Sequence, residues 1–71
     1  MAEEIKVGDR VQIFLHQRVR GDEGWFDGTV VRIDPYSQHR SFHWVELDAE
    51  ATAIVGIRLI SVLNPRNIRK V

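Results

Sequence analysis

The sequence contains no cysteine, only two prolines and no long apolar run. Secreted domains of this size are usually held together by disulfide bonds, so the lack of cysteine favours a reducing compartment such as the cytoplasm. It also excludes a thiol nucleophile and thiolate-based zinc sites. A membrane-spanning helix needs about 20 apolar residues in succession. The acidic start Met1-Ala2-Glu3-Glu4 is unlike a secretory signal peptide. We therefore expect a cytoplasmic protein that makes no membrane contact.

An excess of charge is absent as well, because ten Lys and Arg balance ten Asp and Glu. Proteins dedicated to duplex DNA usually carry a basic excess, since phosphate contacts supply most of their affinity. The equal numbers of acidic and basic residues argue against a protein dedicated to duplex DNA. Nucleic-acid binding is still possible if the basic residues gather on one surface. A small net charge also makes self-association easier.

The chain of 71 residues, 44% of them hydrophobic, is long enough for one globular domain and too short for two. We expect a single domain over residues 1–71, with a frayed lead-in at 1–6. The central feature is the stretch 24–34, where two adjacent aromatics lead into β-branched residues typical of a strand. Gly28 within this strand indicates a β-bulge or a close approach of another backbone.

The remaining elements are short and separated by turn residues. We expect strands at residues 9–15, 25–34, 41–48, 52–63 and 68–71, a long charged loop near 17–24, and a short helical turn near 49–51. The fourth strand should be bent or split at a bulge. Asn64 and Pro65 indicate a 3₁₀ turn capped by the asparagine. These elements predict an all-β fold, a five-stranded SH3-like barrel with a 3₁₀ turn before the last strand.

Alternation along the strands separates a core face from an outer face. Val11, Ile13 and Leu15 share one face of the first strand. On the third strand, Val45 and Leu47 should face the core, so Phe42 and Trp44 should point outward. Outward aromatics indicate an interaction site.

The chain resembles known small β-barrels over nearly its whole length, and three short segments carry the resemblance. Val7-Gly8-Asp9-Arg10-Val11 looks like the opening of SH3-like, Tudor-like and KOW-type modules. Trp25-Phe26-Asp27-Gly28-Thr29-Val30 resembles the second strand of Tudor and agenet domains. Asn64-Pro65-Arg66-Asn67-Ile68 resembles the 3₁₀ turn before the last SH3 strand. The resemblance implies a binding module, and in Tudor-like domains an aromatic cage holds a methylated Lys or Arg. The matching cage positions are Trp25 or Phe26, Tyr36, and Phe42 or Trp44, with Glu46 or Asp48 as a counter-charge.

We expect a non-enzymatic module that binds a protein or peptide partner, or another copy of itself, through an outward aromatic surface. The predicted binding residues are Trp25, Tyr36, Arg40, Phe42 and Trp44. The alternative is single-stranded nucleic acid, whose bases stack on aromatic rings while arginines neutralise phosphates. The basic tail of Arg66, Arg69 and Lys70 would lie close to these aromatics if the barrel closes.

Enzyme interpretations are weaker. Gly8-Asp9-Arg10-Val11 also resembles the opening of the type II dihydrofolate reductases, tetrameric SH3-like barrels, but residues 56–62 lack their Val-Gln-Ile-Tyr segment. His39 and His43 are four residues apart, yet on a turn and a strand they should not share a face, so no metal site is expected. We predict no catalytic residues and no cofactor.

Overall fold

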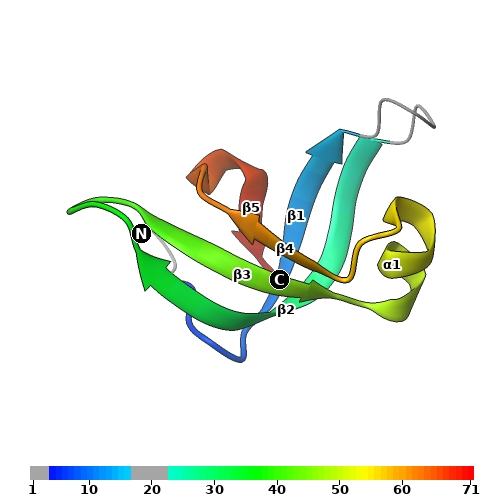
Figure 1. Cartoon of the computed structure of the whole chain (residues 1–71), viewed down its shortest axis with the longest axis horizontal. Coiled ribbons are helices and arrows are strands. Elements are labelled where there is room, and N and C mark those ends of the chain that lie inside the picture. The colour runs from blue at the N-terminus through cyan, green and yellow to red at the C-terminus, as the bar shows by residue number, and fades with distance from the viewer. Residues whose placement is uncertain (1–3, 17–22) are drawn as a thin grey trace.

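The computed structural model describes residues 4–16 and 23–71 of the chain. Five strands, one α-helix and one 3₁₀ helix follow one another as β1 (Arg10–His16), β2 (Glu23–Pro35), β3 (Ser41–Leu47), α1 (Ala49–Val55), β4 (Leu59–Val62), η1 (Pro65–Asn67) and β5 (Ile68–Lys70) (Figure 1). All strands belong to one antiparallel sheet in the order β4-β3-β2-β1-β5. The predicted all-β class, with a 3₁₀ turn before a short last strand, is confirmed. Most of the predicted charged loop lies outside the described residues.

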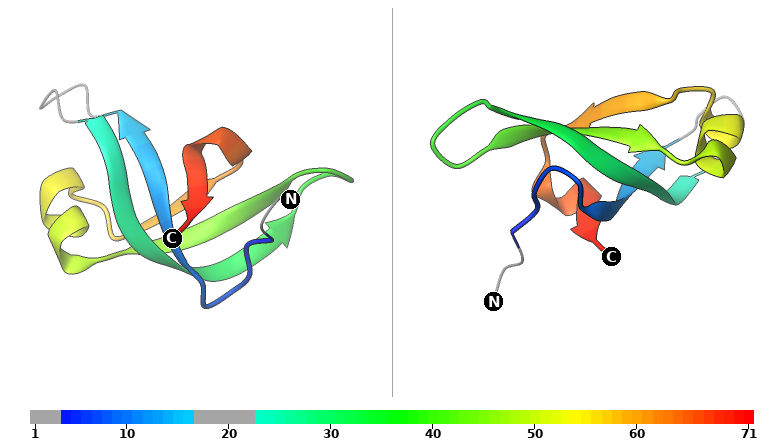
Figure 2. Two further views of the ribbon diagram at one scale, coloured as in Figure 1. Left: turned by 180° about the vertical axis from the view of Figure 1, so that it is seen from behind. Right: turned by 90° about the horizontal axis from the view of Figure 1, so that it is seen from below.

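The sheet is open, which differs from the barrel predicted from the sequence. β4 and β5 are its two edges, and they do not pair with each other in the part of the chain that the structure describes. The sheet nevertheless curves strongly, because the long strand β2 pairs with β1 through its first half and with β3 through its second half. The hairpin of β2 and β3 projects from one end of the molecule, and α1 lies at the opposite end (Figures 1 and 2).

Gly28 lies where β2 passes from one partner strand to the other. It pairs with Val11 on β1 and with Leu47 on β3. A Cβ atom here would lie 2.6 Å from Val45 Cγ1 and 2.7 Å from the carbonyl oxygen of Glu46. The predicted close approach is therefore confirmed. The register shift between β2 and β3 occurs three residues later, between Val30 and Arg32, and not at the glycine.

The core occupies the inner side of the curved sheet. Val11 and Ile13 of β1, Val30 of β2 and Val45 of β3 are almost completely buried. Leu47, Ala51, Val62 and Ile68 complete the core, so every helix and strand except η1 contributes to it. The predicted inward faces of the first and third strands are confirmed, with Leu15 only partly buried at the margin of the core.

The predicted strand over residues 52–63 is wrong in its first half. Residues up to Val55 belong to α1, and β4 begins only at Leu59. Ala49, Ala51 and Ala53 are strong helix formers, and Gly56 ends the helix with a left-handed backbone at φ 78°. These signals prevail over the strand preference of Thr52, Ile54 and Val55. The predicted bulge within the fourth strand is also absent, because β4 pairs with β3 in a continuous register.

Candidate functional site

Two of the predicted binding residues form an aromatic pair at the tip of the β2–β3 hairpin. The rings of Tyr36 and Phe42 meet edge to face with centroids 5.4 Å apart. Tyr36 is 63% exposed, whereas Phe42 is half-buried. This pair and Trp44, which lies on the same face of β3 as Phe42, are called the outward aromatic surface below.

Trp44 is held in place by a polar contact. Its indole Nε1–H donates to Asp34 Oδ2 at 3.0 Å, and Arg32 forms an ion pair with the other oxygen of the same carboxylate. The indole is half-buried. Trp44 therefore lies on the face of β3 opposite to the buried Val45 as predicted, but it is less exposed than the strand pattern suggested.

Trp25 does not join the outward aromatic surface. Its ring packs edge to face on Phe14, and the guanidinium of Arg69 lies 3.9 Å from the ring centroid. Arg69 Nε also donates to Gln12 Oε1 at 2.9 Å. Trp25 thus belongs to a separate cluster over β1, β2 and β5. The aromatic cage expected from the Tudor resemblance would need Trp25 or Phe26 near Tyr36. Among the described residues, the ring of Trp25 contacts Phe14 and that of Tyr36 contacts Phe42, and no ring contact joins the two groups.

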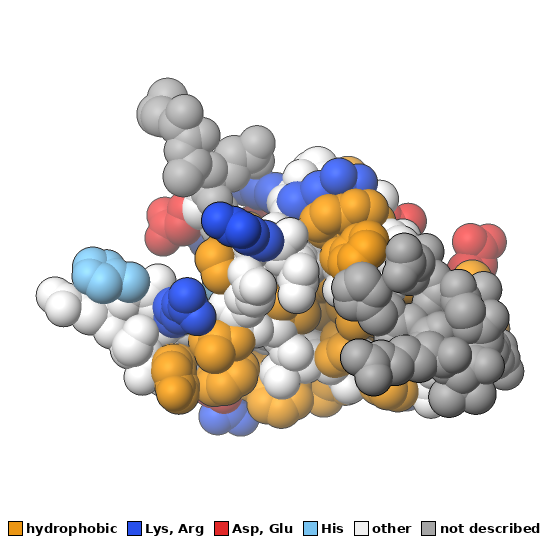
Figure 3. All heavy atoms as spheres, turned by 90° about the horizontal axis from the view of Figure 1, so that it is seen from above, with side chains coloured by type: hydrophobic (Ala, Val, Ile, Leu, Met, Phe, Trp, Pro, Cys, Tyr) orange, Lys and Arg blue, Asp and Glu red, His pale blue; other side chains and the backbone are white. Residues whose placement is uncertain are grey.

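Arg40 lies beside a pocket of about 510 Å³ between the β2–β3 hairpin and the end of the chain. We call it the cationic pocket. Its basic lining consists of His39, Arg40, His43, Arg69 and Lys70. Its other lining residues are Ile5, Ser41, Leu63, Pro65 and Ile68. Figure 3 shows Lys, Arg and His side chains interspersed with apolar side chains on the face seen from above.

Two segments far apart in sequence supply most of the lining of this pocket, and Ile5, before β1, adds to it. Residues 39–43 come from the hairpin turn and the start of β3, whereas 63–70 come from the end of β4, η1 and β5. The turn is closed by the carbonyl oxygen of Arg40, which accepts from the backbone N–H groups of Tyr36 and Ser37 at 3.0 Å. η1 is fixed by Asn64, whose side chain accepts from the backbone N–H of Arg66 at 2.9 Å as the predicted cap.

The positive charge of the pocket is only partly neutralised. Lys70 Nζ lies 3.4 Å from Asp9 Oδ2, and no carboxylate is among the described lining residues. The backbone N–H of Lys6 donates to Asp9, and together with Lys70 it lowers the pKa of this carboxyl group. Among the described residues, no ion pair to Arg40 or Arg69 is found. The described lining residues therefore carry more positive than negative charge, which favours an anion over a cation as a ligand.

His39 and His43 line the same pocket, contrary to the expectation that they would not share a face. The turn bends the chain so that residue 39 and the inward side of β3 border one space. Among the described residues, no group of three or more His, Cys, Asp or Glu side chains could hold a metal ion. The surrounding guanidinium and ammonium groups would also repel a cation.

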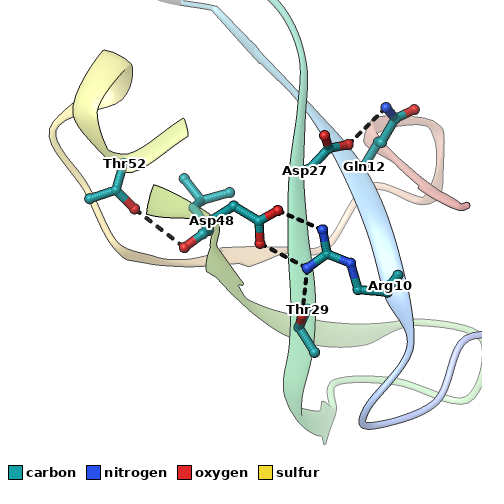
Figure 4. Close-up of polar contacts among 7 residues, drawn as sticks. Arg10, Gln12, Asp27, Thr29, Asp48 and Thr52 are labelled. Carbon is teal, nitrogen blue, oxygen red and sulfur yellow. Dashed lines mark hydrogen bonds and ion pairs between the residues drawn. The ribbon is translucent and has the colours of Figure 1, made fainter. Parts of the chain in front are cut away.

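A polar cluster around Arg10 joins separate elements of the fold and includes none of the described lining residues of the cationic pocket. Arg10 donates to both oxygens of Asp48, at 2.8 and 2.5 Å, and to Thr29 Oγ1 at 2.9 Å (Figure 4). Hydrogen bonding to Asp48 raises the pKa of Arg10, and the same contact lowers the pKa of Asp48. Asp48 stands at the N-cap of α1, yet its side chain makes no capping bond. This carboxylate joins β1 to the β3–α1 junction instead.

The structure brings some of the predicted binding residues together and separates others. Tyr36, Phe42 and Trp44 lie together on the hairpin, Arg40 lines the cationic pocket, and Trp25 packs on Phe14. The basic tail was expected to lie close to the aromatics if the barrel closed. The sheet is open, and Arg69 and Lys70 line the cationic pocket with Arg40, whereas none of the three aromatics on the hairpin is among its described lining residues. His39 and His43 were missed as pocket residues. Strand alternation placed His43 on the inward face, and that was the available signal.

Within residues 4–16 and 23–71, no helix is long and apolar enough to cross a membrane. Comparison of the chain with protein-family models, with curated proteins and with solved structures finds no match.

Proposed function

We propose that this protein is a non-enzymatic cytoplasmic module that binds single-stranded nucleic acid at the cationic pocket. The observation that carries the proposal is the lining of the pocket. Arg40 and two histidines line it from the hairpin, Arg69 and Lys70 line it from β5, and no carboxylate is among the described lining residues. The Arg69 guanidinium packs on Trp25 and Lys70 pairs with Asp9, so Arg40 is the cation with no ion pair or ring contact among the described residues. Phosphate groups of a nucleic acid supply the negative charge that such a lining attracts.

The hairpin turn favours a single strand over a duplex. It carries the exposed ring of Tyr36 together with Arg40, whose carbonyl oxygen holds the turn. A strand that crosses this turn can stack one base on Tyr36 while a neighbouring phosphate contacts Arg40. Base stacking on an aromatic ring contributes about 1–3 kcal/mol. Duplex DNA hides its base faces, so it would offer no base to stack on Tyr36. More of its affinity would then have to come from phosphate contacts, which a chain of zero net charge supplies poorly.

The fold is compatible with this function but does not specify it, since small β folds host many functions. We assign the chain to the SH3-like class as part of the proposal. The strand order β4-β3-β2-β1-β5, the bent second strand and the 3₁₀ turn before β5 support the assignment.

The test is a titration of the full chain with a labelled oligothymidylate of about 12 nucleotides at several salt concentrations. We expect a linear fall of log affinity with log salt, with a slope of about −0.7 for each phosphate contact. Arg40→Gln should weaken binding about fivefold, equivalent to about 1 kcal/mol, and should flatten the salt slope.

Arg58→Gln is the matched control because it removes the same charge outside the pocket, where Arg58 pairs with Glu46 at 3.1 Å. The control should bind like the unchanged protein. Equal affinities for the two variants, or binding that does not respond to salt, would contradict the proposal.

A second candidate is a protein or peptide partner on the outward aromatic surface, including another copy of the chain. The exposure of the Tyr36 ring beside Phe42 favours it. In that case Tyr36→Ala should abolish binding or self-association, Arg40→Gln should change little, and salt should have a small effect. Light scattering on a sizing column identifies self-association directly, since one chain has a mass of 8.2 kDa.

A further inference from the structure

Arg69 connects the cationic pocket to the outer face of the sheet. It is among the lining residues of the pocket, and it follows Ile68 on β5, whose side chain belongs to the core. Alternation along the strand therefore puts the side chain of Arg69 on the opposite face. From there it reaches across β1, the strand between β5 and β2, to the ring of Trp25.

The guanidinium of Arg69 is held by two contacts. Its Cζ lies 3.9 Å from the centroid of the Trp25 ring, and its Nε donates to Gln12 Oε1 at 2.9 Å. Gln12 is fixed in turn, because its Nε2 donates to Asp27 Oδ1 at 2.9 Å (Figure 4). These contacts restrain the planar group before a ligand arrives, so a ligand that uses it has less side-chain entropy to overcome.

One side of this guanidinium is covered by the indole, and the other side is available to a ligand. Arg69 is exposed, and its Nη groups have no hydrogen-bond partner among the described residues. The carboxylate of Asp27 accepts from Gln12, and among the described residues no ion pair reaches Arg69. A guanidinium plane is a surface on which unpaired nucleobases stack. An unpaired base is therefore the group that this arrangement suits.

We propose that a single strand bound at Arg40 continues from the pocket over Arg69, where one base stacks on the guanidinium. The base, the guanidinium and the indole of Trp25 then form one stack on the outer face of β1, β2 and β5. The inference rests on the proposed function and adds a second contact to it. The planar shape of Arg69 matters here as well as its charge, and lysine supplies only the charge.

The experiment measures affinity for oligothymidylates of about 3 to about 12 nucleotides at one low salt concentration. Arg69→Lys should lower the affinity for the longest oligomer about fivefold, the lower end of the range for stacking of one base, and should leave the shortest unaffected. Arg66→Lys is the matched control, because it makes the same change at an exposed position of η1 outside the pocket lining. It should bind like the unchanged protein at every length.

Two further measurements separate base stacking from attraction between charges. An oligomer of abasic deoxyribose phosphates keeps the phosphates and offers no base, so the unchanged protein and Arg69→Lys should bind it equally. Tryptophan fluorescence of the unchanged protein should respond to the longest oligothymidylate and much less to the abasic oligomer. Trp25→Phe leaves Trp44 as the one tryptophan and should lose most of this response.

The outcomes separate the two proposals. Absence of binding at low salt at every length would overturn the proposed function and this inference with it. Binding that Arg40→Gln weakens and Arg69→Lys does not would overturn the second contact alone. An equal loss in Arg69→Lys for short, long and abasic oligomers would do the same, because Arg69 would then act through its charge. If Arg69→Lys failed to fold in thermal melting, an equal fluorescence response of the unchanged protein to both oligomers would still exclude base stacking.

Discussion

Val45 and Trp44 are neighbours on β3 that occupy opposite surroundings. Val45 is completely buried, whereas Trp44 is half-buried on the outer face and donates its indole N–H to Asp34. The alternation of apolar and polar positions was enough to predict which of the two faces the core. It could not predict the contact with Asp34, because that carboxylate comes from the neighbouring strand.

Gly28 allows β3 to approach β2 closely. Gly28→Ala places a methyl group against Val45 Cγ1 and the carbonyl oxygen of Glu46. Only the first of these atoms is on a side chain, so relaxation is limited. We expect a loss of about 1–3 kcal/mol in the free energy of unfolding, measured by urea denaturation.

The companion variant is Val45→Ala, which should cost about 1–3 kcal/mol as a buried truncation. In the double variant the methyl group meets less opposition from residue 45, so the combined loss should be smaller than the sum of the two single losses. If the loss in the double variant equals the sum of the two single losses, contact of the new methyl group with Val45 is not the cause of the destabilisation by Gly28→Ala.

At the scale of elements, α1 is the clearest case in which the sequence pattern predicted a strand and the structure has a helix. Residues 52–55 are rich in β-branched side chains, yet Ala51 packs into the core and the helix ends at Gly56. The backbone N–H of Gly56 donates to the carbonyl oxygen of Thr52 at 2.8 Å. A glycine after a short alanine-rich segment is a helix-ending signal as well as a bulge signal, and the core contact of Ala51 decides between them.

Gly56→Ala tests this helix end. A residue with a Cβ atom in the left-handed conformation costs about 1–2 kcal/mol, so we expect a loss of stability in that range. Gly56→Asn should lose less, because asparagine adopts this conformation more readily. Chemical denaturation monitored by circular dichroism measures both. Equal losses for the two variants would indicate a cause other than the backbone conformation.

At the scale of the whole molecule, the Arg10–Asp48 ion pair joins the first residue of β1 to the residue that precedes α1 (Figure 4). Both side chains remain partly exposed, so solvent weakens the attraction. The pair nevertheless has a directional consequence, since the contact lowers the pKa of Asp48 in the folded state from its ordinary value of 3.8.

The unfolded chain therefore binds a proton at Asp48 before the folded chain does. Stability from this group is present above pH 3.8 and is lost as the pH falls through the lower pKa of the folded state. Asp9 acts in the same direction. We expect urea midpoints to decrease as the pH falls from neutral into this acid range, and Asp48→Asn should decrease less. If the urea midpoint of Asp48→Asn falls as steeply with decreasing pH as that of the unchanged protein, Asp48 is not a source of the pH dependence.

The sequence by itself determined the local features: the strand faces, the buried positions Val11, Ile13 and Val45, and the capped turn at Asn64. Each depends on a short repeat or on a cap that acts over a few residues. Only the tertiary structure decided that residues 52–55 are helical, that the sheet stays open, and that residues 39–43 meet 68–70 around one pocket. These outcomes depend on strand register and on contacts between segments distant in sequence, which no short pattern encodes.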